Sequence, residues 1–105
     1  MIKQEKIERW FKETYDNFRE GLQRLQGNPV NNPSAFIAVS GHMDLIMIWD
    51  NTGKRLPKGD YLAALNAMEI AAKTRPPEIR DNWMQEIGII RERGKDYFGV
   101  EALVA

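Results

Sequence analysis

The side chain best suited to acid–base or metal chemistry is His42, the only histidine in the chain. An imidazole titrates near neutral pH and serves as a general base or as a metal ligand. A metal site on a helix needs further ligands three or four residues away, and the residues at those spacings are apolar: Ala38, Val39, Leu45 and Ile46. Because nothing nearby completes a catalytic set, we expect a structural or surface role for His42.

Carboxylates, glycines and cysteines give no stronger indication of an active site. Acidic residues between positions 78 and 86 belong to a segment that also contains basic residues, which is typical of a solvated helix face. Glycines show neither G-x-G-x-x-G nor P-loop spacing, and the absence of cysteine excludes disulfides and zinc–thiolate sites. We therefore predict no catalytic residues, no metal and no cofactor, and a chain that is not an enzyme.

Two groups of basic residues are candidates for contacts with phosphate. One is the loop with Lys54, Arg55 and Lys58, and the other is the pair Arg91 and Arg93. Fifteen Lys and Arg balance fifteen Asp and Glu, however, and the formal net charge is +0. Nucleic-acid-binding proteins usually carry a basic excess, so a nucleic-acid-binding regulator is the alternative hypothesis and not the leading one.

The elements that position these residues are predicted to be four helices, near 3–25, 33–52, 60–74 and 77–98. In the first, apolar side chains recur every three or four residues from Ile7 to Leu25. Asn32 and Asp60 are placed to cap the second and third helices, and Gly53 and Gly99 to stop the second and fourth. Short connections favour antiparallel neighbours, so we predict an all-α antiparallel four-helix bundle.

The 105 residues suit a single domain, with 100–105 as a tail that docks or frays. An alternative fold competes in the middle of the chain. Residues 36–39 and 45–49 are short apolar runs, and the turn-like residues 50–53 follow the second run. This pattern also fits a short hairpin at about 36–56, which would make the fold α+β.

Two central segments, 35–49 and 61–72, are apolar over most of a helical circumference. In 35–49 the polar residues Ser40 and Asp44, with Asn51 just beyond, cluster on one side, which we predict to be a thin line facing solvent. Helices of this kind must be covered on several sides, and a chain of this length has little material for that cover. The surplus of apolar surface therefore indicates self-association or a protein partner.

Aromatic, methionine and small residues near the edges of the predicted stripes are candidates for such an interface. They are Trp10, Met47, Trp49, Ala63, Ala67, Met84 and Ile89. The leading hypothesis is a non-enzymatic protein-interaction module, an adaptor, inhibitor or regulator that acts as a homo-oligomer or on another protein.

Further expectations concern the aromatic residues and the location of the chain. The three tryptophans, Trp10, Trp49 and Trp83, could meet in one aromatic core. A third hypothesis is a small-ligand pocket inside the bundle, lined by Tyr15, His42, Tyr61 and Trp83. The longest apolar run is too short for a membrane span, and a charged start without cysteine fits the cytoplasm.

Overall fold

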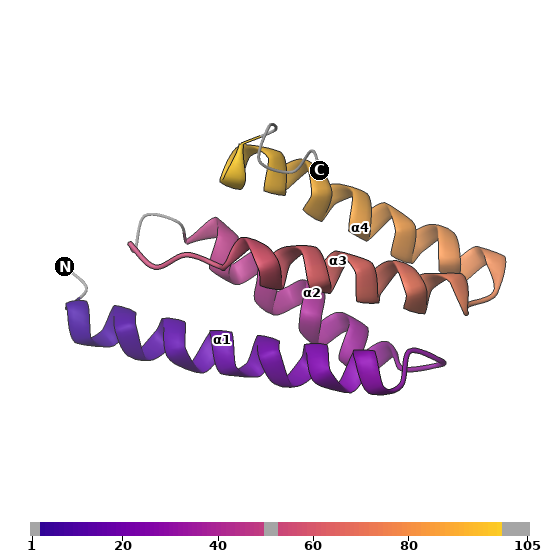
Figure 1. The fold of residues 1–105 in the computed structure, drawn as a ribbon, viewed down its shortest axis with the longest axis horizontal. Helices are drawn as coiled ribbons and strands as arrows, with labels where there is room; N and C mark the ends of the chain where they lie inside the picture. The colour runs from indigo at the N-terminus through magenta and orange to yellow at the C-terminus, as the bar shows by residue number, and fades with distance from the viewer. Residues whose placement is uncertain (1–2, 50–52, 100–105) are drawn as a thin grey trace.

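The computed structural model describes residues 3–49 and 53–99. These residues form four helices, α1 (Gln4–Gly27), α2 (Pro33–Ile48), α3 (Lys58–Lys73) and α4 (Pro77–Phe98) (Figure 1). The helices pack as an antiparallel bundle, which confirms the predicted all-α fold. The hairpin alternative is wrong, because residues 36–48 are helical and the described part of 36–56 contains no strand. The predicted tail at 100–105 and Asn51 lie outside the described residues.

The ends of α1 and α2 follow local chemistry. Asn28 follows the last helical residue of α1, and its N–H donates to the carbonyl of Arg24 at 3.0 Å. Asn32 caps α2 as predicted, its side-chain oxygen accepting from the N–H of Ala35 at 3.4 Å. At the other end α2 stops at Ile48, earlier than the predicted stop at Gly53.

The start of α3 differs from the prediction that Asp60 would cap it. The helix begins at Lys58, directly after Pro57, whose ring fixes φ at −61°. Asp60 lies in the first turn, where it accepts hydrogen bonds from the Tyr15 hydroxyl and, at 2.6 Å, from the Arg19 guanidinium. The carboxylate therefore joins α3 to α1 instead of capping its own helix.

Successive helices reverse direction, and α3 lies between α1 and α4 in Figure 1. Helix α2 passes behind α3, where it contacts all three other helices. A Cβ at Gly21 would lie only 3.1 Å from the Cβ of Ala38, so this glycine allows α1 to come very close to α2. The core between the helices contains the fully buried side chains of Phe18, Leu25, Val39, Met43, Ile46, Tyr61, Met68, Ile87 and Ile90.

Candidate functional site on the outer face of helix α2

One side of α2 is apolar and faces solvent, and we call it the α2 outer face. Its large side chains keep 65% (Ile37), 43% (Leu45), 61% (Ile48) and 45% (Trp49) of their surface exposed. Together with Gly41, the first three lie within about 80° of one another around a helix of 100° per residue. The opposite side of α2 packs into the core through Val39 and other buried residues.

Gly41, at the centre of this face, is not explained by packing among the residues that the structure describes. Apart from its two chain neighbours and the backbone of its own helix, none of these residues has an atom within 4 Å of a Cβ built at this position. Glycine inside a helix costs about 1 kcal/mol relative to alanine, because the unfolded glycine backbone has more freedom to lose. The chain therefore carries a helix-weakening residue at an open position, flanked one turn away by exposed Ile37 and Leu45.

An aromatic pair forms the border of the face toward α1. The rings of Trp10 and Trp49 have their centroids 6.0 Å apart and are tilted by 57°. Trp83 belongs elsewhere: its ring stacks on Phe36 with centroids 4.1 Å apart. Of the three tryptophans that could meet in one aromatic core, Trp10 and Trp49 contact each other, whereas Trp83 packs against the core between α2 and α4.

Charged residues form the border of the face toward α4. Asp44 of α2 makes an ion pair with Arg93 of α4. The pKa of the neighbouring Glu86 is raised above its ordinary value, first because the side chain is partly buried and second because Asp44 is close. Ile89 lies between Glu86 and Arg93 in the sequence of α4, and 46% of its surface is exposed.

The predicted solvent line on α2 is wrong for Ser40, and Asp44 is only partly exposed. Ser40 is buried, and its hydroxyl donates to the carbonyl of Ile37 at 3.2 Å. Asp44 is directed to Arg93 of α4, as described above. Ser40 therefore lies inside the bundle and Asp44 is partly covered beside Arg93, whereas the apolar residues next to them on α2 face solvent.

His42 lies beside this face without any catalytic partner among the described residues. Its ring nitrogen Nδ1 lies 2.5 Å from the carbonyl oxygen of Ala38, so this nitrogen carries the proton and donates. The other three residues of the hypothetical pocket have separate partners: Tyr15 binds Asp60, Tyr61 donates to the carbonyl of Ile90 at 3.2 Å, and Trp83 stacks on Phe36. These four side chains do not form one pocket.

The predicted interface residues have different positions. Trp49, Met84 and Ile89 are exposed, whereas Trp10 and Ala63 are half-buried. Met47 and Ala67 are buried in the core of the chain, and their side chains offer almost no surface to a partner. Sequence reasoning missed three residues of the face, Ile37, Leu45 and Ile48, although their spacing around Gly41 is that of one helical stripe.

The basic candidates for phosphate binding are largely engaged within the chain. The Arg55 guanidinium lies over the Tyr97 ring, 3.9 Å from its centroid. Arg91 pairs with Glu69 of α3, and Arg93 pairs with Asp44 of α2. Lys58 is exposed at the start of α3, and Lys54 is half-buried. The two arginines of α4 therefore bind different neighbouring helices and do not form a joint basic surface.

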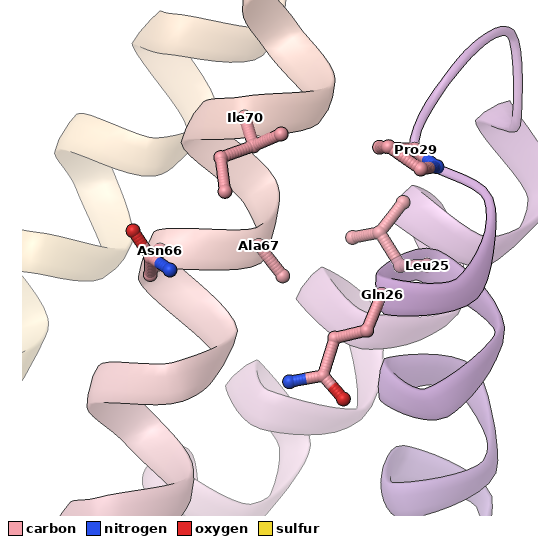
Figure 2. Close-up of a pocket in the computed structure, with 6 residues that line it drawn as sticks. All are labelled: Leu25, Gln26, Pro29, Asn66, Ala67 and Ile70. Atoms are coloured by element: carbon pink, nitrogen blue, oxygen red, sulfur yellow. The ribbon is translucent and has the colours of Figure 1, made fainter.

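A small hollow lies between the C-terminal end of α1 and α3 (Figure 2). Its volume is about 110 Å³. The residues that line it are Leu25, Gln26, Pro29, Asn66, Ala67 and Ile70. Pockets that hold a drug-sized ligand usually measure roughly 300 to 1,000 Å³, so this hollow accommodates at most a single small side chain.

Within residues 3–49 and 53–99, no group of three or more His, Cys, Asp and Glu residues is arranged to hold a metal ion. None of the helices in this part of the chain is long and apolar enough to cross a membrane. Comparison with known proteins finds no matching family model, no matching curated protein and no matching solved structure.

Proposed function

We propose that this chain is a non-enzymatic protein-interaction module of the cytoplasm, an adaptor, inhibitor or regulator that binds through the α2 outer face. The observation that carries the proposal is the row of exposed side chains Ile37, Leu45 and Ile48 around Gly41. Contiguous apolar surface on a folded chain is stabilised when a partner removes it from water. Patches of this kind are often sites of protein interaction.

The size of the face limits the kind of partner. Four large side chains at about half exposure present on the order of 400 Å² of apolar surface. Burying that area contributes about 10 kcal/mol at 25 cal/mol per Å². Association costs roughly 4 to 15 kcal/mol in lost freedom of motion. A stable complex therefore needs a partner that contributes an apolar surface of its own.

Charge supports a protein partner over a nucleic acid. The α2 outer face carries no charged side chain, and Asp44 at its edge is neutralised by Arg93. Phosphate binding depends on cations that are free to make contacts. Here Arg91 already pairs with Glu69, and Arg55 lies over Tyr97.

Photo-crosslinking in the native cells tests the proposal. A benzophenone amino acid placed at Leu45 reports on what contacts the α2 outer face, and the same probe at Gln23, an exposed position on α1, is the matched control. We expect at least fivefold more protein adduct from position 45 than from position 23. Equal yields from the two positions, or no adduct from position 45, would contradict the proposal.

A further inference from the structure

The apolar residues of the α2 outer face are arranged symmetrically about Gly41. Ile37 precedes Gly41 by four residues and Leu45 follows it by four. If two α2 helices meet antiparallel across a two-fold axis at Gly41, each Ile37 lies against Leu45 of the other copy. The two glycines then lie opposite each other at the centre, where the helix axes come closest.

The ends of the stripe fit the same arrangement. Ser34 and Ile48 each lie seven residues from Gly41, so the two-fold axis places the large Ile48 over the small Ser34 of the other copy. The Ser34 hydroxyl is already paired, because it accepts from the Arg24 guanidinium at 2.7 Å. Covering this serine with an isoleucine therefore keeps the hydroxyl oxygen paired with Arg24.

The area of the face also matches what one side of a dimer needs. A standard interface buries about 800 Å² per partner, of which roughly 57% is apolar. The apolar surface of the α2 outer face, on the order of 400 Å², supplies most of the apolar area that one partner contributes to such an interface. The formal net charge of the chain is +0, so two copies do not repel each other at long range.

We infer that the occupant of the α2 outer face is a second copy of this chain, packed with α2 antiparallel to α2 across a two-fold axis at Gly41. The inference rests on the proposed function. It names one partner, a second copy of the chain, and one register between the two α2 helices. It also gives a role to Gly41, the helix-weakening residue that packing within the chain leaves unexplained.

The first test is analytical ultracentrifugation of the purified full chain. We expect a reversible dimer with a dissociation constant on the order of 10 μM, since the interface lies at the lower end of the standard size. A chain that stays monomeric up to about 1 mM would overturn the inference.

Disulfide trapping then tests the register. The chain has no cysteine, so Ile37→Cys and Leu45→Cys introduce single thiols. In the antiparallel arrangement, the two copies of position 37 lie about 12 Å apart along the helix axis, too far for a disulfide. We expect at least fivefold more cross-linked dimer from an equal mixture of the two variants than from either alone. Efficient cross-linking of Ile37→Cys alone would show a parallel arrangement and overturn the inference.

Gly41→Ala separates the role in the dimer from any role within the chain. We expect it to weaken dimerisation at least fivefold, because two methyl groups at the axis push the helices apart. Its melting temperature, measured on the monomer, should rise. The matched control is Gly88→Ala on α4, where a Cβ also meets nothing within 4 Å; it should leave dimerisation unchanged. Dimerisation weakened equally by both variants, or unaffected by Gly41→Ala, would contradict a contact at Gly41.

The crosslinking at Leu45 distinguishes the proposed interaction function from the self-association of the chain. An adduct of twice the mass of the chain supports both the proposed function and the self-association. An adduct with a different protein alone, together with a monomeric purified chain, would retain the interaction function and overturn the two-fold inference. The absence of any adduct would contradict both the proposed function and the self-association.

Discussion

Two glycines in the middle of helices have opposite surroundings. Gly94 of α4 faces α3, and a Cβ there would lie only 2.0 Å from the hydroxyl oxygen of Tyr61. Gly41 of α2 faces open space, and a Cβ there would meet nothing within 4 Å. The α3–α4 contact is therefore closed, with glycine required by a buried neighbour. At the α2 outer face, contacts among the described residues do not explain Gly41 and its exposed apolar neighbours. A partner that covers this face would explain them.

The sharpest contrast within one helix is between adjacent residues Phe36 and Ile37. Phe36 is 3% exposed and stacks on Trp83, whereas Ile37 is 65% exposed. We expect Phe36→Ala to lower the free energy of unfolding by about 3 to 5 kcal/mol. Ile37→Ala should change it by less than about 0.5 kcal/mol.

Urea denaturation at concentrations that keep the chain monomeric measures both changes. Working with the monomer matters because Ile37 belongs to the face that we propose to be covered in the dimer. Similar decreases in the free energy of unfolding for the two variants would show that Ile37 is buried within the chain. The contrast between the closed α3–α4 contact and the open α2 outer face would then not hold.

The closed region itself is tested by Gly94→Ala. The added methyl group would overlap the Tyr61 ring as well as its hydroxyl, and Tyr61 is fully buried. We expect a loss of about 2 to 3 kcal/mol in the free energy of unfolding.

A double-mutant cycle identifies the cause of that loss. In a Tyr61→Leu background, Gly94→Ala should cost at least about 1 kcal/mol less, because the overlapping ring is gone. Gly88→Ala is the control on the same helix and should be neutral or stabilising. A cost for Gly94→Ala that is the same with and without the Tyr61 ring would refute the steric explanation.

A smaller effect is expected from Tyr61→Phe, which removes only the hydroxyl. That hydroxyl donates to the carbonyl of Ile90 at 3.2 Å, and its loss should cost about 1 kcal/mol. Burial raises the pKa of Tyr61 above its ordinary value of 10.0. The folded chain therefore favours the neutral phenol, and this contribution is complete below pH 10 and lost as the pH rises through the raised pKa.

Unfolding measured from pH 8 to 11 tests this expectation. The stability advantage of the wild type over Tyr61→Phe should shrink above pH 10, because only the wild type has a buried phenol to ionise. An advantage that grows with pH would show that the phenolate is stabilised in the fold and would contradict burial as the dominant cause.

The sequence predicts the closed parts of this molecule better than the open face. Periodic apolar residues predicted α1, and Asn32 predicted the start of α2. Asp60 and Asp44 were misplaced because their partners, Arg19 and Arg93, are more than forty residues away in the sequence. Trp49 and Ile89, which were expected at the edges of their stripes, are exposed, but the exposure of Ile37 was not expected. Which side of a nearly all-apolar helix faces solvent depends on where distant helices provide a cation or a ring.

An effect smaller than that of Tyr61→Phe is expected at the border between the two regions, at Glu86. Partial burial, and then the charge of Asp44, raise its pKa above the ordinary 4.5, and Arg93 only partly opposes this. Ionised Glu86 is therefore less favourable in the folded chain than in the unfolded chain. Its contribution to stability is complete below pH 4.5 and is lost as the pH rises through the raised pKa.

Glu86→Gln should consequently increase the free energy of unfolding at pH 7, by less than about 1 kcal/mol because the side chain is partly solvated. The gain should disappear as the pH falls below 4.5, where the wild-type side chain is also neutral. Asp81→Asn removes an exposed carboxylate from the same helix and should leave stability nearly unchanged at both pH values. A Glu86→Gln variant that is less stable than the wild type at pH 7 would mean that Glu86 is held by Arg93. Asp44, Glu86 and Arg93 would then form a stabilising network of three charges at the border of the α2 outer face. A second copy of the chain would have to pack on this face without displacing these charges.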